Sequence, residues 1–191
     1  MIEQKTSLVH WNYFLSLEKD IEMLSRYIEF DERNFDTFSI ELAHILLAAS
    51  SEIDVVLKLI CKLFEPSKSP KSINSYRQII TRDIKNFAND KVSITRYGLT
   101  LEPWVNWIEN KNPYWWQSYN KVKHERNYHF SEANLKNSLN AMAGLLVCIF
   151  HYYRKIFSIE HKIDFNDRQT HAHLKPNTSF FTIRPVYYVI T

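Results

Sequence analysis

Glycine is almost missing from this chain, which has two among its 191 residues. Sheet proteins use glycine in hairpin turns and bulges, where the backbone often needs a positive φ. A fold built mainly of strands is therefore disfavoured, and long helices become the expected building block. The length suits a single domain with a substantial core. We expect an all-α fold, specifically a four- or five-helix bundle.

Cysteine is equally scarce. Cys61 and Cys148 are the two cysteines, and both lie in apolar helical runs. We expect buried free thiols, so a reducing compartment fits better than one that favours disulfides. The longest apolar run, "AMAGLLVCIF", is too short to span a bilayer, and the N-terminal "MIEQKTSLVHWNYF" lacks the apolar core of a signal peptide. We therefore expect a cytoplasmic protein without membrane contact.

Several catalytic signatures are absent as well. The sequence has no phosphate loop and no GxGxxG, GxSxG or HExxH pattern, so ATP hydrolysis, dinucleotide chemistry and serine hydrolysis have no support. His161, His171 and His173 come nearest to a metal site, in a segment expected to be a loop. No cysteine or carboxylate cluster completes such a site, so neither a metal nor a cofactor is expected.

The charge is small in total and uneven along the chain. The net charge is +3, yet residues 1–65 hold 12 acidic and 6 basic side chains, and the rest of the chain holds 9 and 18. The acidic part can cover some of the basic part, or pair with it in a second copy. The remaining basic surface would attract an anionic partner such as RNA or DNA. A solvated surface without a partner is the alternative.

Helical signals dominate what the sequence does contain. In most of the predicted helices, apolar residues recur every three or four positions, as they do on a buried helix face. The predicted helices cover residues 8–28, 39–64, 72–87, 112–123 and 131–156. Their predicted start signals are Ser39 or Thr37, Ser72, Asn112 followed by Pro113, and Ser131.

A small β part is predicted beside the helices. Over residues 91–104 the pattern changes to alternation and includes one glycine, which indicates a short hairpin or an extended loop. Trp104 and Trp107 are expected to anchor it to the helices. The final stretch, "SFFTIRPVYYVIT", is β-prone and apolar, and it can add a strand to this hairpin.

The most concentrated polar and aromatic stretch is "PYWWQSYNKVKHERNYHF", residues 113–130. On a helix, Trp116, Asn120 and His124 follow at intervals of four and project from nearly one face. Lys123 and Asn127 extend this face, and an adjoining row holds the other candidates. The full set of candidates is Trp116, Tyr119, Asn120, Lys123, His124, Arg126 and Asn127. We expect the helix to break near residue 127.

These residue types suit chemistry on a phosphodiester. A histidine near neutral pH can take a proton from a ribose 2′-hydroxyl or give one to a leaving oxygen, which is the role expected of His124. Arg126 or Lys123 can stabilise charge on the phosphoryl oxygens, and Asn120 can orient a phosphate. In the alternative, Asn120 and His124 bond each other and the nearby backbone, and only fix the helix corner.

Three neighbouring features bear on this cluster. Glu52 is expected beside the buried stripe of its helix, where a carboxylate needs a partner. We expect that partner to be His124, Arg126 or Lys123. In the alternative, Glu52 faces solvent. His10 and His44 lie on or near apolar stripes and are expected to be structural. Adjacent helical residues point about 100° apart, so at most one of Trp115 and Trp116 is expected in the core. We expect Trp115 to pack against the hairpin and Trp116 to pack near the polar site.

The stretch "YNKVKH", Tyr119 to His124, resembles the RN-x-x-x-H-type motif of the HEPN superfamily. Asn120 and His124 fall on the polar residue and the histidine of that motif, whereas Tyr119 occupies the arginine position. The "YN-x-VKH-x-R" pattern followed by "F-x-x-AN" is similar to an uncharacterised HEPN-like branch. The resemblance covers about residues 39–157, which leaves 158–191 as a C-terminal extension of one domain.

The resemblance implies an all-α bundle, often a homodimer with the motif at a shared cleft. Many HEPN proteins are metal-independent endoribonucleases of toxin–antitoxin, abortive-infection or CRISPR systems, and others are nucleotide- or RNA-binding modules. The expected partners are RNA, a cognate antitoxin or other protein, and a second copy. Arg126 can replace the missing arginine if two-fold pairing brings the second copy's Arg126 close. A non-catalytic binding module and a purely structural interaction protein are the alternatives.

Overall fold

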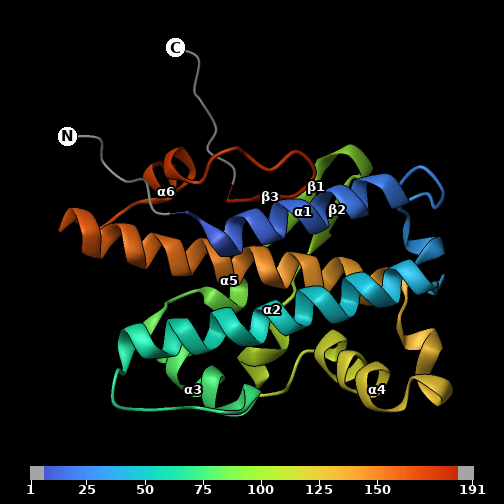
Figure 1. Ribbon diagram of the computed structural model, residues 1–191, viewed down its shortest axis with the longest axis horizontal. Coiled ribbons are helices and arrows are strands. Elements are labelled where there is room, and N and C mark those ends of the chain that lie inside the picture. The colour runs from blue at the N-terminus through green and yellow to red at the C-terminus, as the bar shows by residue number, and fades with distance from the viewer. Residues whose placement is uncertain (1–6, 185–191) are drawn as a thin grey trace.

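The computed structural model describes residues 7–184, and this part of the chain is mostly helical with a small antiparallel sheet (Figure 1). The α-helices are α1 (Val9–Leu24), α2 (Ile40–Phe64), α3 (Ile73–Asp83), α4 (Tyr114–His129), α5 (Leu135–His161) and α6 (Asp167–His173). The strands are β1 (Val92–Ile94), β2 (Leu99–Leu101) and β3 (Thr182–Ile183). The short 3₁₀ helices are η1 (Glu32–Asn34), η2 (Phe87–Asn89), η3 (Thr95–Tyr97), η4 (Val105–Glu109) and η5 (Phe130–Glu132).

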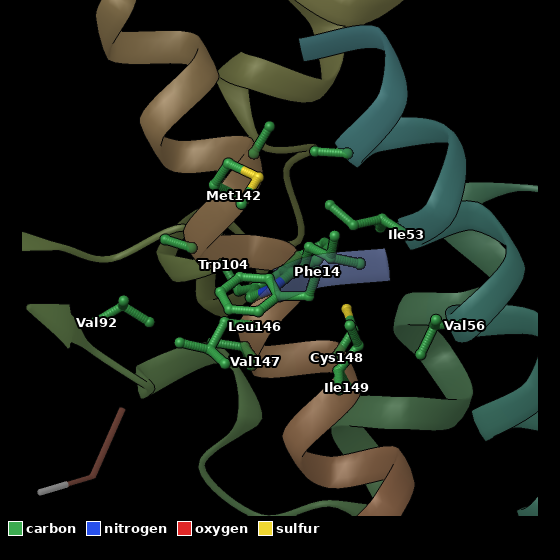
Figure 2. Close-up of a cluster of buried hydrophobic side chains, with 14 of the residues drawn as sticks. Phe14, Ile53, Val56, Val92, Trp104, Met142, Leu146, Val147, Cys148 and Ile149 are labelled. Carbon is green, nitrogen blue, oxygen red and sulfur yellow. The ribbon is translucent and has the colours of Figure 1, made fainter. Parts of the chain in front are cut away.

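Helices α2 and α5 form the centre of the fold. They pack along each other, with α1 and α6 on one side and α3 and α4 on the other (Figure 1). Every side chain of α5 from residue 137 to 151 is buried, so this helix has no solvent-facing side over that length. Figure 2 shows Met142, Leu146 and Ile149 of α5 packed with Phe14, Ile53 and Trp104, which come from three other parts of the chain.

Gly144 explains how the tryptophans reach this centre. A Cβ at this position would lie 3.0 Å from Trp115 Cζ2, so glycine makes room for the indole. The same residue also accepts a hydrogen bond at its carbonyl oxygen from Trp104 Nε1, at 3.2 Å. One of the chain's rare glycines is thus used for close packing against a helix and not for a turn.

Helix α5 is also the one helix in residues 7–184 that is long and apolar enough to cross a membrane by length and composition. Its most apolar window is 67% buried within the protein. Such burial is what the core helix of a soluble protein shows.

The predicted starts of α2 and α3 are confirmed. The Ser39 hydroxyl accepts a hydrogen bond from the N–H of Leu42, and Ser72 forms a reciprocal capping box with Ser75. The predicted cap of α5 at Ser131 is wrong, because Ser131 lies in the 3₁₀ turn η5 and Asn134 caps the helix.

Three other predicted boundaries also shift. Helix α4 begins after Pro113, and no side chain caps it, so the predicted Asn112 cap is wrong. Helix α1 ends at Leu24, before the predicted residue 28, where the chain turns through 3₁₀-type hydrogen bonds. Helix α3 ends at Asp83 and not at residue 87, and Asn86, at φ 68°, turns the chain into η2.

The predicted hairpin and its extra strand are both present. Strand β1 pairs with β2 through Val92 and Leu101, and the connection ends at Gly98 with φ 64°. Strand β3 adds to the other edge of β1, where Ile183 is paired with Val92. The sheet order is therefore β2-β1-β3, while residues 185–191 of the predicted strand lie outside the described residues.

A buried glutamate holds the segment that leads into β3. Glu18 of α1 is 2% exposed, and its carboxylate accepts hydrogen bonds from the backbone N–H groups of Ser179, Phe180 and Phe181, each at 3.1 Å. Phe180 and Phe181 then pack into the main core. The C-terminal extension therefore belongs to the folded body, although the resemblance placed the core at about residues 39–157.

The two cysteines are located as predicted, whereas the segment with the C-terminal histidines is not. Cys61 and Cys148 are buried free thiols, as predicted, and burial raises the pKa of Cys61 to about 12. The segment with His171 and His173 was expected to be a loop, which is wrong, because it forms α6. Asn166 starts that helix through a capping box with Gln169.

Candidate functional site

Helix α4 carries the candidate residues and bends in their middle. Its backbone leaves helical geometry at Glu125, with φ −136° and ψ 44°. The predicted break near residue 127 therefore occurs two residues earlier, directly after His124. His124 ends the regular part of the helix, and Arg126 and Asn127 lie beyond the bend.

The candidate residues divide into an exposed and a buried group. The exposed group, here called the α4 polar face, consists of Asn120, Lys123, His124, Arg126 and Asn127. Trp116 and Tyr119 are 7% and 6% exposed, and they form the aromatic layer beneath this face. Their ring centroids lie 5.2 Å apart.

The expectation that only one tryptophan of the 115–116 pair reaches the core is wrong, because both are buried. Trp115 donates from Nε1 to the carbonyl oxygen of Pro103 at 2.7 Å, directly after the hairpin, as predicted. Trp116 packs against the ring of Tyr119. Trp104 also packs edge-to-face on Trp115, so each indole of the pair has an aromatic neighbour from outside the pair.

Few contacts restrain the α4 polar face. The Asn120 amide donates to the carbonyl oxygen of Trp116 at 2.9 Å, so it bonds its own helix and not His124. The Lys123 ammonium lies 5.5 Å from the centre of the Tyr119 ring, within the range of a cation–π contact. No hydrogen bond or ion pair links His124 or Arg126 to another part of residues 7–184. Both remain available to a partner.

A groove lies beside the bend of α4. It encloses about 620 Å³ between α4 and the first turns of α2. Its lining residues are Ile40, Ala43, His44, Arg126, Asn127 and Phe130. An imidazole, a guanidinium and an amide therefore face one open space with an apolar floor.

His44 is the residue of this groove that sequence reasoning missed. It was expected to be structural, but its side chain is 62% exposed, with Nδ1 3.6 Å from a carboxylate oxygen of Glu41. The missed signal is its spacing. His44 lies two residues from both Leu42 and Leu46, which places it about 200° around the helix from the buried stripe.

Two acidic residues brace the turn after α4. Glu132 accepts hydrogen bonds from Lys121 at 2.7 Å and from Ser118 at 2.6 Å, and these contacts hold the pKa of Glu132 below its ordinary value. Glu125 lies 3.4 Å from His129 across the bend. The turn is thus held by contacts of residues that do not belong to the α4 polar face.

Glu52 lies elsewhere, and its predicted pairing with His124, Arg126 or Lys123 is wrong. Its carboxylate contacts Nδ1 of His10 at 2.5 Å, between α2 and α1. The backbone N–H of His10 also donates to the Tyr153 hydroxyl at 3.3 Å. Helix α1 covers this side of α2, whereas α4 packs against another, so Glu52 cannot orient His124 through a direct contact (Figure 1).

The C-terminal histidines do not assemble a metal centre. The rings of His161 and His173 lie 5.4 Å apart, but His171 packs on Phe150 instead. Within residues 7–184, no group of three or more histidine, cysteine, aspartate or glutamate side chains is placed to hold a metal ion.

No protein-family model, no curated protein and no solved structure matches this chain.

Proposed function

We propose that this chain is a HEPN-like helical-bundle domain that acts on RNA through the α4 polar face, within a prokaryotic defence or toxin–antitoxin system. The observation that carries the proposal is the exposure of His124 and Arg126 on either side of the bend at Glu125. Structural residues of a packed bundle would be buried and bonded, whereas these two have no bond or ion pair with other described residues.

The proposed reaction is a metal-independent cleavage of the RNA backbone. His124 takes the proton of a ribose 2′-hydroxyl, the 2′-oxygen attacks phosphorus, and the bond to the 5′-oxygen breaks as that oxygen takes a proton from water. The products are a 2′,3′-cyclic phosphate end and a free 5′-hydroxyl end. Lys123 and Arg126 offset the negative charge that develops on the phosphoryl oxygens, and Asn120 and Asn127 position the phosphate.

Pairing of two copies would complete this chemistry. Position 119 holds a tyrosine where the resembled motif has an arginine, so one chain offers less positive charge beside His124. A two-fold contact across the groove beside α4 would bring Arg126 of a second copy toward His124. The apolar floor of that groove, with Ile40 and Phe130, suits such a contact.

The test is cleavage of a mixed RNA substrate by the purified chain in the presence of EDTA. We expect products ending in a 2′,3′-cyclic phosphate, lost in His124→Ala and reduced at least tenfold in Arg126→Ala. His161→Ala, which changes an exposed histidine at the end of α5, should cleave like the original chain. Full activity in His124→Ala would refute the proposed acid–base role.

The burial of Tyr119 favours a second candidate, a non-catalytic module that binds RNA or a protein partner. Tyr119 is 6% exposed and its ring supports Lys123, so this position belongs to the packing and carries no charge. Such a module would bind RNA without cutting it, with an affinity that falls steeply as salt increases. Lys123→Ala and Arg126→Ala would each reduce the salt dependence by about one phosphate contact.

A further inference from the structure

A second cavity lies under the C-terminal extension, away from α4. It has a volume of about 530 Å³ and lies among α1, α5, α6 and the segment that leads into β3. We call it the C-terminal pocket. Helix α6 and residues 174–178 form one wall, and α5 forms the floor. Its size is in the range of pockets that hold small organic molecules.

The C-terminal pocket has an apolar floor, while its lining as a whole exposes apolar and polar surface in similar amounts. Trp11, Leu146, Phe150 and Ile183 all line it, and each is at least 97% buried in the protein. The Trp11 N–H already donates to the carbonyl oxygen of Pro176 at 3.0 Å, so its indole presents carbon and not a free donor. A ligand would therefore place an apolar body here.

One polar atom in the wall lacks a partner. Nε2 of His171 is buried and makes no hydrogen bond to any other described residue. The ring is held by packing on Phe150, with centroids 5.0 Å apart. A buried ring nitrogen without a partner costs free energy, and a hydrogen-bonding group of a ligand would remove that cost.

The charge of the lining selects the sign of that group. Arg168 and Lys175 line the C-terminal pocket, and no aspartate or glutamate of the described residues does. The Lys175 ammonium donates one hydrogen bond, to the Asn177 side chain at 2.7 Å, and an ammonium has three protons to donate. The pocket thus offers an imidazole nitrogen and an ammonium to an anion.

We propose that the C-terminal pocket binds a small organic carboxylate with an apolar body. The carboxylate accepts hydrogen bonds from His171 Nε2 and from Lys175 Nζ, and the body packs between Trp11 and Phe150. This site is independent of the proposed action on RNA, because the α4 polar face lies on the other side of α2 and α5 (Figure 1). It also gives the C-terminal extension a role beyond covering the core.

The experiment is calorimetric titration of the full chain with phenylpropionate and with octanoate. Phenylpropanol, which has the same body without the charge, is the matched ligand control. We expect saturable binding of at least one carboxylate and at least roughly tenfold weaker binding of the alcohol, since the alcohol cannot form the charge-assisted hydrogen bonds. Absence of binding by both carboxylates would overturn the proposal.

Matched variants locate the site. His171→Phe keeps the ring packing on Phe150 and removes the nitrogen, so carboxylate binding should weaken about tenfold. His173→Gln changes an exposed residue of the same helix outside the pocket and should bind normally. Lys175→Met, at an exposed position, tests the charge if His171→Phe does not fold. Equal affinity in His173→Gln and in the folded pocket variants would place the ligand elsewhere and overturn the assignment.

Discussion

Glu18 shows how a single side chain can fix a distant segment. It is almost fully buried, and its two oxygens receive three backbone N–H groups from residues 179–181. Those N–H groups come from consecutive residues, and all three point at the one carboxylate. The peptide dipoles thereby compensate the negative charge of Glu18. The same hydrogen bonds fix the position of the segment that leads into β3.

Glu18→Gln should therefore destabilise the protein. A glutamine offers one acceptor oxygen and turns an N–H₂ group toward N–H donors, so we expect a loss of about 2–4 kcal/mol in the free energy of unfolding. Glu22→Gln, at an exposed position of the same helix, should change this free energy little. Urea unfolding followed by circular dichroism measures both. Equal unfolding midpoints for the two variants would contradict the anchoring role.

His151 and Asp90 form a second buried pair. His151 Nε2 lies 2.6 Å from an Asp90 carboxylate oxygen, and Arg184 Nε lies 2.6 Å from the other oxygen. Burial lowers the pKa of His151, although the Asp90 carboxylate opposes this effect and the nearby Arg184 and Arg154 reinforce it. The imidazole is therefore held neutral in the folded protein.

This pair predicts a loss of stability in mild acid. As the pH falls below about 6.5, the unfolded chain takes up a proton at His151 before the folded chain does, so protonation favours unfolding. Chemical unfolding at pH 7.5 and pH 5.5 should show a larger decrease for the original chain than for His151→Gln, whose amide can still donate to Asp90. His44→Gln, at an exposed site, should keep the original decrease. A pH dependence unchanged in His151→Gln would refute this account.

At the scale of elements, the sequence predicted a helix well where local capping residues and prolines alone determine its ends. Helix α2 was predicted almost to the residue, because Ser39 caps it and the segment after Phe64 contains prolines. The start of α5 was missed by three residues, because Ser131 was predicted as the cap and Asn134 is the cap. There Asn134 bridges to Phe38, and the N–H of Leu135 bonds the carbonyl oxygen of Thr37. These long-range contacts determine which residue caps the helix, and the spacing of apolar residues in the sequence does not reveal them.

The cap of α5 gives a direct test of this point. Asn134 accepts the N–H of Asn137 at 3.0 Å, so Asn134→Ala should lower the free energy of unfolding by about 1 kcal/mol. Ser131→Ala removes the hydroxyl that the sequence suggested as the cap, and it should have almost no effect. Unfolding curves of the two variants, measured side by side, decide between the two caps. A larger effect at residue 131 would contradict the observed cap.

The α4 polar face was predictable only in part. Helical spacing places Asn120 and His124 on one face of α4, but it places the buried Trp116 on that face as well, so spacing alone does not predict which of them are exposed. The partner of Glu52 was not predictable, since His10 lies 42 residues away in the chain. Burial of Trp116 was also missed, because its indole packs against the rings of Trp115 and Tyr119. Sequence reasoning thus reached the local geometry and not the tertiary partners.

At the scale of the whole molecule, the C-terminal extension closes against α1, the first helix. The core at α2 and α5 is covered on one side by α1, and α1 is secured by the segment of residues 174–181. Phe14 of α1 packs edge-to-face on Phe181, so apolar surface of the first helix is covered by the last described residues. The first helix and the C-terminal extension form one unit.

A chain that ends at residue 163 tests this closure. It lacks α6, β3 and the segment that contacts Glu18, so Trp11 and Phe150 would become exposed, and the carboxylate would keep no backbone partner. We expect severe loss of stability, with aggregation or binding of a hydrophobic dye, because several large side chains lose their cover. Analytical gel filtration and dye fluorescence of the truncated chain measure this. A monomeric truncated chain of undiminished stability would contradict the closure.

The anchoring of residues 179–181 by Glu18 has a consequence for synthesis on the ribosome. Glu18 emerges early, but its partners follow 161 to 163 residues later, and β3 pairs with a strand made about ninety residues before it. During translation the apolar side of α1 therefore has no final cover until residues 179–183 have left the exit tunnel. Until then this surface of the nascent chain stays open, where a chaperone or a second nascent copy can reach it.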